Sequence, residues 1–468
     1  MKTHRVLIAL AAAAALAACA TTDTTPPAVD LPAMNAPAVP AIDRWWLQFD
    51  DPLLTALIEE TLANNLDLRI AVARIEEARA VLRLARSFQF PAIDADVSAG
   101  RARRSDAIEP TFPGDLTTNL FGAGLNVAYE VDLWNRLGAG TAAARAQLLS
   151  TRFGAETVRT VLAGQVAFAY FALLGYDAEL RLTRDTLRTR VESVGLQKQR
   201  YDAGLIAEFE LRQAEGERAT VASSIPPLER AVAQSEAALA VLAGRSPRAV
   251  YTPVVARNAE LRADETGPIV PDGLPSDLLA RRPDVRQAEA DLVAASFRID
   301  QARAQYFPAL ALTARLGSES TELSDLFSGP AFVWSVAGSA LQPIFNAGRI
   351  TSQVEAARAQ REQAEAAYVR TVQGAFRDAH DALVDHRAAR DSFVAQEDRR
   401  VQYAEALRLS ALRYRAGYSS YLEVLDNQRN LLDAERARLL ALRARQSALV
   451  DLYKALGGGW SPEQFAQR

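Results

Sequence analysis

The stretch RYDAGLIAEFEL at residues 200–211 returns as RYRAGYSSYLEV at residues 413–424. Both copies read Arg-Tyr-x-Ala-Gly and carry an acidic residue six positions after the glycine. The copies lie 213 residues apart (413 − 200), nearly half of the 468-residue chain. Solenoid repeats are far shorter, about 20–50 residues each. The spacing therefore predicts a duplicated half-domain.

The duplication extends over most of the chain. Phe90-Pro91-Ala92 matches Phe307-Pro308-Ala309, and Ala144-Arg145-Ala146-Gln147 matches Ala357-Arg358-Ala359-Gln360. We expect each half to contain a helix, a pair of strands, a long helix, a turn and a second long helix. The predicted segments are a signal peptide (1–18), an N-terminal lipidated arm (19–50), the first repeat (51–244), an equatorial linker (245–275), the second repeat (276–457) and a C-terminal tail (458–468).

Two long helices are predicted from the absence of proline. No proline occurs between Pro113 and Pro226, or between Pro343 and Pro462, and both stretches are rich in strong helix formers. Helices over about 141–203 and 349–415 would each exceed 60 residues, roughly 90 Å at the rise of an α-helix. That length implies coiled-coil-like packing between helices. A free-standing coiled-coil dimer is the alternative, but clean heptads do not persist.

Four short segments show the alternation of β-strands: about 91–100, 119–133, 309–317 and, more weakly, 331–342. Strands with one apolar and one polar face are typical of a barrel that faces lipid. Four strands cannot close a barrel, and an open sheet edge is not viable in hydrocarbon. Several copies must therefore pool their strands, and three copies would give twelve.

The N-terminus predicts export. Lys2 and Arg5 precede an apolar run over 6–16 that is too short to span a bilayer, and Leu16-Ala17-Ala18-Cys19 resembles a bacterial lipobox. We expect cleavage before Cys19 and attachment of lipid, palmitate included, to this sole cysteine. Ala20 does not resemble an inner-membrane retention signal, which favours the outer membrane. An ordinary signal peptide with a chance cysteine is the alternative.

Composition excludes several classes of function. The net charge of −4 argues against a nucleic-acid partner. After the signal there is no stretch of 18 or more apolar residues, so we expect no transmembrane helix, and any crossing of a membrane would have to use strands. The sequence carries no phosphate loop, no Cys-x-x-Cys and no nucleophile elbow, and His380 and His386 are not spaced as a metal pair. We therefore expect no enzyme activity, no cofactor and no metal site.

Several motifs together resemble one family. They are Trp45-Trp46, Asn64-Asn65-Leu66-Asp67-Leu68, the stretch LPSDLLARRPDV at 274–285 and the two Tyr-x-x-Gly turns. The chain resembles the lipoprotein branch of the TolC/OprM-like outer-membrane factors of tripartite (RND-type) efflux systems. The resemblance implies a mixed α and β fold: a homotrimer with a twelve-stranded outer-membrane β-barrel, four strands per chain, continued by a long periplasmic α-helical barrel.

The resemblance also implies a function. The trimer would be a passive conduit for drugs or other small toxic compounds, docked to a periplasmic adaptor (membrane fusion) protein and an inner-membrane RND-type transporter. A protein-secretion (type I) exit duct of the same fold is one alternative. A periplasmic structural lipoprotein without a barrel is another, and the alternating segments 119–133 and 310–316 count against it.

The repeated stretch is predicted to form the two turns at the periplasmic mouth, because glycine is favoured just past a helix end. Glu423 and Asp426 would then form rings of carboxylates that favour cations, and the resemblance aligns them with an acidic pair that constricts the entrance. Alternatively, Glu423 only caps its helix in a capping box with Ser420.

The resemblance assigns further roles at the turns. Glu210 and Tyr414 align with a contact between hairpins that keeps the entrance shut. Ser419 stands where the family's closing network has an arginine, so closure would rest on hydrogen bonds or on Arg413 and Arg415. The expected adaptor contacts, which are alternatively no more than turn residues, are Arg200, Gly204, Leu205, Arg413, Gly417 and Ser419.

Overall fold

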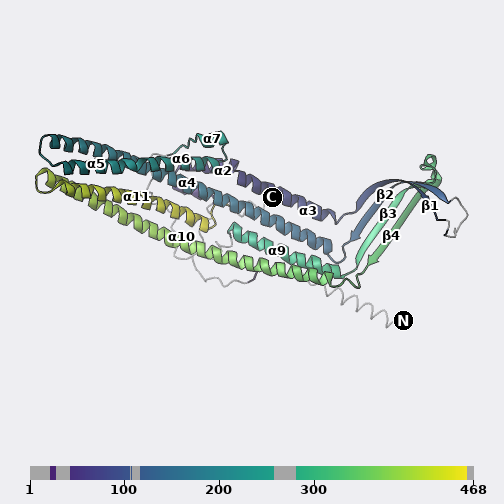
Figure 1. The fold of residues 1–468 in the computed structure, drawn as a ribbon. Coiled ribbons are helices and arrows are strands. Elements are labelled where there is room, and N and C mark those ends of the chain that lie inside the picture. Colours follow the sequence, from purple (N-terminus) through teal and green to yellow (C-terminus); the bar gives the residue numbers. More distant parts are fainter. Residues whose placement is uncertain (1–21, 28–42, 106, 108–115, 258–280, 461–468) are drawn as a thin grey trace. The chain divides into compact units, whose positions relative to one another are not determined.

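The computed structural model describes residues 22–27, 43–105, 107, 116–257 and 281–460 (Figure 1). The chain divides into two compact units. The first is built around Arg74–Arg152 and Gln287–Val369, and the second around Phe153–Arg286 and Arg370–Arg468. Each unit therefore takes residues from both predicted halves of the sequence.

The first unit holds a four-stranded antiparallel sheet in the order β1-β2-β3-β4. The strands are β1 (Ala92–Arg103), β2 (Thr117–Val131), β3 (Ala309–Ser320) and β4 (Phe332–Leu341). All four lie where the alternation predicts them. β1 and β3 each continue three residues further than expected, because their ladders with β2 extend into the predicted loops.

Adjacent rows of the sheet alternate between apolar and polar side chains. One row pairs Leu125 with Leu316 and Leu316 with Trp334, and the next row pairs Asn126 with Arg315. On the polar face, the Asp96 carboxylate accepts hydrogen bonds from Asn126 (2.6 Å) and Arg315 (3.3 Å). The sheet thus has one apolar and one polar face, as the sequence predicts.

Two long helices, α4 (Arg136–Asp202) and α10 (Arg349–Arg415), run through both units, and each has 67 residues. Shorter helices accompany them: α3 (Leu66–Ser87), α9 (Pro283–Arg303) and the 3-10 turn η2 (Ala304–Tyr306). Although no apolar run is uninterrupted, α4 is the one helix among the described residues that is long and apolar enough to cross a membrane, and 61% of its 18-residue apolar window is buried. Packing inside the protein explains this composition.

The second unit adds the returning helices. Those that follow the two turns are α5 (Glu208–Ser223), α6 (Ile225–Leu242) and α11 (Tyr421–Ala455). The unit also contains the shorter elements η1 (Trp45–Phe49), α2 (Pro52–Asn64) and α7 (Pro247–Tyr251). The expectation of one long returning helix in each half is correct for α11 and wrong for the first half. There the helix breaks at Ser224, because the two prolines that follow are tolerated only in the first turn of a new helix.

Aromatic side chains from η1 and α11 pack together in the core of the second unit. Trp45 and Trp46 are fully buried, and Trp45 stacks on Tyr453 of α11 at 5.7 Å between ring centroids. Burial raises the pKa of Tyr453 to about 12. The Trp-Trp motif therefore attaches the end of the N-terminal arm to the end of α11.

Part of the predicted linker is also fixed. Arg245 forms two 2.8 Å hydrogen bonds with the Glu60 carboxylate of α2, and Arg257 pairs with Asp177 of α4 and Glu236 of α6. Linker residues 258–275, tail residues 461–468 and the signal with Cys19 lie outside the described residues.

Candidate gate and docking site at the hairpin tips

The structure places the same turn at both copies of the repeated stretch. Past the end of α4, Gly204 has φ +70°, and Leu205 N–H donates to the Arg200 carbonyl at 2.8 Å. Past the end of α10, Gly417 has φ +79°, and Tyr418 N–H donates to the Arg413 carbonyl at 2.9 Å. Both are Schellman motifs, in which glycine takes the left-handed position that a side chain disfavours.

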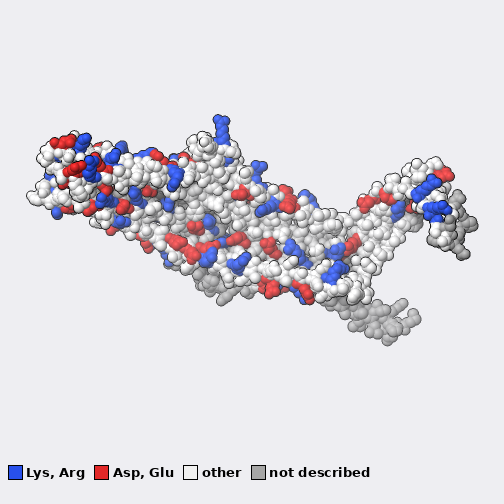
Figure 2. Space-filling view, in the orientation of Figure 1, with Lys and Arg blue, Asp and Glu red and all other residues white. Residues whose placement is uncertain are grey.

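Each tip exposes apolar side chains at the turn. Leu205 is 72% exposed and Tyr418 is 80% exposed, and Phe209 and Leu422 on the returning helices are also exposed. Charged side chains of both signs are intermixed around the tips on the face seen in Figure 2. The tips therefore combine an apolar turn with charged flanks, which suits a protein contact.

The two hairpins of one chain meet just behind the tips. Arg200 of α4 donates a hydrogen bond to the Tyr414 hydroxyl of α10, and its guanidinium lies 5.1 Å from the centroid of the Tyr414 ring. Ser193 and Tyr421 are joined through their hydroxyls at 2.6 Å. Of the residues predicted from the sequence, Arg200 and Tyr414 are thus brought together.

The two predicted gate carboxylates have different partners. Glu423 forms an ion pair with Arg413 at 3.4 Å, within the second hairpin. Asp426 pairs with Arg429 at 3.3 Å, and Arg429 Nε also donates to the Glu217 carboxylate of α5 at 2.8 Å. We call Glu217, Asp426 and Arg429 the hairpin joint, because it links α5 of the first hairpin to α11 of the second.

The predicted capping box is wrong in its location. Ser420 makes no side-chain capping bond, whereas Glu210 accepts a hydrogen bond from Ala207 N–H at 2.7 Å and so caps α5. Arg413 provides Glu423 with a charged partner instead. Within one chain, Glu210 thus bonds its own helix, and Tyr414 bonds Arg200.

Ser419 does not take over the role of an arginine. Its hydroxyl oxygen is buried and has no hydrogen-bond partner among the described residues. The sequence left hydrogen bonds, or Arg413 and Arg415, as candidates for holding the entrance shut. The structure contains hydrogen bonds between the hairpins and an Arg413–Glu423 ion pair.

Sequence reasoning missed Arg190, Glu217 and Arg429. Arg190 of α4 is only 4% exposed, and burial lowers its pKa while the nearby Glu217 carboxylate opposes that shift. Charged residues at helical spacing are usually solvated, and nothing in a single sequence tells which of them meet across two hairpins.

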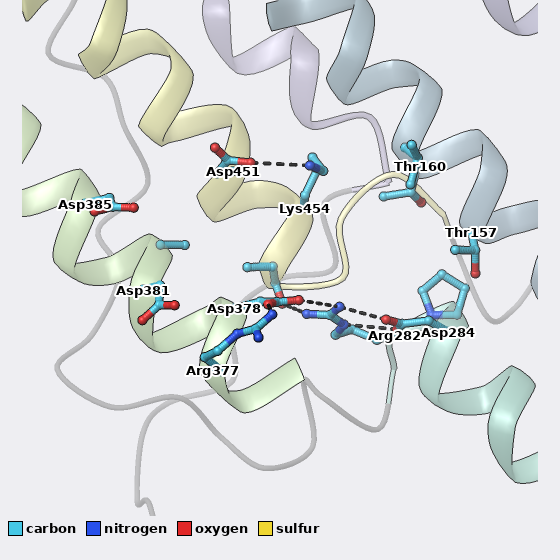
Figure 3. Close-up of a pocket in the computed structure, with 14 residues that line it drawn as sticks. Thr157, Thr160, Arg282, Asp284, Arg377, Asp378, Asp381, Asp385, Asp451 and Lys454 are labelled. Atoms are coloured by element: carbon cyan, nitrogen blue, oxygen red, sulfur yellow. Dashed lines mark hydrogen bonds and ion pairs between the residues drawn. The ribbon is translucent and has the colours of Figure 1, made fainter. Parts of the chain in front are cut away.

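A second charged cluster lines a cavity of about 640 Å³ in the second unit (Figure 3). Arg282 lies between Asp284 of α9 (2.7 Å) and Asp378 of α10 (3.2 Å) and approaches the Ala455 carbonyl of α11 (3.5 Å). Burial lowers the pKa of Arg282, but these carboxylates outweigh it and raise the pKa overall. The Arg-Arg-Pro-Asp part of the sequence motif therefore joins three helices.

The charges of this cavity do not form a metal centre. The described residues contain no group of three or more His, Cys, Asp or Glu side chains placed to hold a metal ion. The charged side chains of this cavity instead form ion pairs, Arg282 with Asp284 and Asp378, and Lys454 with Asp451.

The comparison with known proteins identifies the family. The family model for the outer membrane efflux protein matches residues 57–245 and 274–458, once in each predicted repeat. The chain belongs to the outer membrane efflux protein family. This identification confirms the resemblance inferred from the motifs and the duplication inferred from the turns.

Individual relatives cover nearly the whole chain. The toluene efflux pump outer membrane protein TtgI of Pseudomonas putida is 36% identical over 89% of this chain and 87% of its own length. The cation efflux system protein CusC of Escherichia coli is 33% identical over 89% of this chain and 88% of its own length.

Solved structures confirm the TolC-like fold. A crystal structure of CusC has a TM-score of 0.86 at 30% identity and covers 94% of this chain and 99% of its own. The outer-membrane channel OprN has a TM-score of 0.84 at 29% identity and covers 94% of this chain and 100% of its own.

Proposed function

We propose that this chain is the outer-membrane channel of a tripartite efflux pump and that its hairpin tips form the gated periplasmic mouth. The observation that carries the function is a four-stranded sheet, apolar on one face, attached to two 67-residue helices in a chain of the efflux family. The relatives are named for the efflux of toluene and of cations. The substrate class assigned here is small toxic compounds.

The architecture follows from the sheet edges. β1 and β4 are the outer strands of the sheet in one chain, and hydrocarbon requires that both edges be paired. Three chains satisfy this requirement in a twelve-stranded barrel, with β1 of one chain against β4 of the next. The long helices continue the duct as an α-helical barrel in the periplasm, and Cys19 anchors each chain to the outer membrane through its lipid.

The mouth is closed at rest by contacts between the hairpins. The Arg200–Tyr414 contact and the hairpin joint hold the second hairpin against the first, and opening requires both to separate. Three copies of Glu423 and Asp426 then provide carboxylates at the narrowest part, which favours cations over anions. Glu210 supports the gate by fixing the start of α5, so that the first tip keeps its shape.

The turns themselves contact the periplasmic adaptor, while the RND-type transporter supplies the energy. Support comes from the exposure of Leu205 at a rigid turn and from the placement of Arg200, Arg413 and Ser419 beside the two glycines. Replacing Leu205 with Asp is therefore expected to lower efflux of a fluorescent substrate in cells without changing the conductance of the purified channel.

The first experiment measures the mass and conductance of the lipidated protein extracted in detergent. We expect a trimer that conducts with cation selectivity in planar bilayers, and lower selectivity in Glu423→Gln and Asp426→Asn. Glu405→Gln is the matched control, because Glu405 is exposed on α10 and, among the described residues, pairs with Arg408 of the same helix alone. A monomer without conductance would contradict the proposed channel function. Unchanged selectivity in both variants would contradict the placement of Glu423 and Asp426 at the narrowest part of the channel.

A further inference from the structure

The segment just after Cys19 is held by a carboxylate of α9. Thr22 N–H donates to both oxygens of Asp300, at 2.8 Å and 3.1 Å, and the Thr22 hydroxyl donates to the same carboxylate. Arg303 donates to the Thr22 hydroxyl oxygen at 3.2 Å. We call Thr22, Asp300 and Arg303 the N-terminal clasp.

We propose that Asp300 is the docking site for the chain's own lipid-proximal segment, residues 22–27, and that it fixes where the lipid anchor leaves the protein. This inference rests on the proposed attachment of lipid to Cys19. It goes beyond the conduit function, because it assigns a defined position on the protein to the segment that follows the lipidated cysteine.

The surroundings of Asp300 show that Thr22 is its main partner. The Asp300 side chain is only 12% exposed; Arg303 forms an ion pair with it at 3.9 Å, too long for a hydrogen bond, so the hydrogen bonds described for this carboxylate all come from Thr22. A buried carboxylate without hydrogen bonds is strongly disfavoured. Because two of its bonds come from a backbone N–H, Asp300 binds the main chain of the segment, whichever side chain stands at position 22.

The segment lies along the protein beyond its first residue. From Thr22 to Pro26, half-buried residues alternate with exposed Asp23 and Thr25, the alternation of an extended chain on a surface, and Pro27 is half-buried as well. Asp23 accepts a hydrogen bond from Thr25 N–H at 2.8 Å. Hydrogen bonds from Thr25 hold the pKa of Asp23 below its usual value, with the charge of Arg361 on α10 adding to the effect.

The helix that carries Asp300 packs against α10 through a hydrophobic core. Ile299 and Ala302 of α9 form a buried cluster with Val354 and Ala357 of α10. Asp300 therefore stands on a helix pair that is fixed by its own core, and a segment bound to Asp300 is fixed with it.

Chain length then limits the position of the lipid. Cys19 and Thr22 are three positions apart in the sequence, so their Cα atoms lie within about 11 Å of each other. From Asp300 to Tyr306, the last turn of α9 and η2 rise about 10 Å toward β3, which begins at Ala309. The residues that join α9 to β3 therefore lie within the reach that this chain length allows from the clasp.

Among the described residues, the clasp is the attachment nearest in sequence to Cys19. The next described segment along the chain begins at residue 43, and Trp45 is its first fully buried residue. From Cys19 to Trp45 the chain has 26 residues (45 − 19), which span up to about 90 Å when extended. The clasp shortens that reach to about 11 Å and places the acyl chains beside the base of the sheet.

Hydrogen exchange of the intact, lipidated trimer in detergent tests the clasp, with intact mass measured on the same sample. We expect protection of the peptide containing Thr22 and at least tenfold faster exchange there in Asp300→Ala, with a smaller change in Asp300→Asn, which keeps one acceptor oxygen. Asp291→Asn is the matched control, because Asp291 lies on the same helix and bonds Gln147 at 3.2 Å instead. Unchanged exchange in the α9 and α10 peptides shows that the variants are folded.

Two outcomes would overturn the inference, in distinguishable ways. An unprotected Thr22 peptide in the wild type, or equal protection in Asp300→Ala, removes the clasp while lipidation and conductance stand. An intact mass without lipid on Cys19 removes the positioned anchor even where the peptide is protected. The conductance of the same trimer reports the channel function independently of both.

Discussion

Glu217 of α5 and Arg429 of α11 form an ion pair that joins the two hairpins of one chain. The Glu217 side chain is only 12% exposed, whereas Arg429 is 50% exposed and also pairs with Asp426. A carboxylate proposed for the cation-selective ring is therefore tied to the contact that must break on opening. In the proposed mouth, Asp426 would therefore contribute to both cation selectivity and closure.

Removal of Arg429 is expected to favour the open mouth. In Arg429→Ala the largely buried Glu217 loses its partner, which costs on the order of 1–2 kcal/mol in a partly exposed pair, or roughly a five- to thirtyfold shift toward opening. Single-channel recording should show more frequent and larger openings. Arg429→Lys, which keeps a positive charge beside Glu217 and Asp426, should retain part of the closure.

Arg212→Ala is the control for this prediction, because the ion pairs of Arg212 in the described part of the chain are with Glu208 and Glu215 of its own helix. If Arg429→Ala and Arg212→Ala conduct alike, the hairpin joint does not hold the mouth shut.

Tyr414 and Arg200 allow the hydroxyl and the ring to be tested separately. Tyr414→Phe removes a hydrogen bond, worth about 0.5–1.5 kcal/mol, but keeps the ring beneath the guanidinium. Arg200→Ala removes the hydrogen bond and the cation–π contact, which adds about 0.5–1 kcal/mol. We therefore expect a graded rise in open probability, larger for Arg200→Ala than for Tyr414→Phe. Tyr418→Phe, at an exposed turn position, should leave gating unchanged; equal effects of Tyr418→Phe and Tyr414→Phe would contradict the assignment.

The turn at Gly417 can be tested without a steric clash. A Cβ at Gly417 would meet nothing within 4 Å, so the cost of Gly417→Ala comes from the left-handed backbone alone and should be about 1 kcal/mol. Asn tolerates this conformation better, so Gly417→Asn should cost less. Local exchange of the Tyr418 N–H measures both. Gly374→Ala, inside α10 and equally free of contacts, should stabilise its helix instead; a destabilisation equal to that of Gly417→Ala would show that the turn is not the cause.

The long helices and the strands could be predicted from the sequence because local signals define them. The absence of proline and the turn glycines predicted α10 at about 349–415, which are its observed ends. They predicted α4 at about 141–203, and the helix begins earlier, at Arg136, and ends at Asp202. The hairpin joint could not be predicted. Glu217 and Arg429 lie 212 residues apart, and their pairing depends on how two hairpins pack.

The helix caps show a subtler limit. Both turns carry an acid six residues past the glycine. The serine three residues before Glu423 made a capping box there the alternative to a role in the gate. The structure uses Glu210 as the cap instead and pairs Glu423 with Arg413. A charged partner from the preceding helix competes with the backbone N–H, and only the fold reveals that partner.

The pairing of β2 with β3 depends on Gly317, which lies opposite Gly124. A Cβ at Gly317 would lie 2.5 Å from the Ala123 carbonyl oxygen and 2.8 Å from Gly124 Cα, both backbone atoms that cannot move away alone. Gly317→Ala should therefore lower the fraction of protein that runs as a detergent-resistant trimer. Gly338→Ala is the matched control in β4, because its Cβ would meet only the flexible Leu312 side chain at 3.4 Å. Equal trimer yields for the two variants would contradict this account.

Acid should weaken the contact that fixes the linker to α2. The hydrogen bonds from Arg245 hold the pKa of Glu60 below its ordinary value of 4.5, and burial opposes this effect. A carboxyl whose pKa is lowered by folding stabilises the protein above its ordinary pKa, and this stability is lost as the pH falls through the lower, folded-state pKa. Because the Glu60 side chain is about a third exposed, we expect a contribution on the order of 1 kcal/mol.

Urea unfolding followed by the fluorescence of the buried Trp45 and Trp46 measures this contribution. The stability of wild type over Glu60→Gln should be constant above about pH 5 and should shrink as the pH falls below 4.5. Glu229→Gln is the control, because Glu229 and its partner Arg184 are both half exposed and the pair should contribute less at every pH. A difference between wild type and Glu60→Gln that grows on acidification would mean that Arg245 does not favour the charged form of Glu60, and the linker would then be held by Arg257 alone.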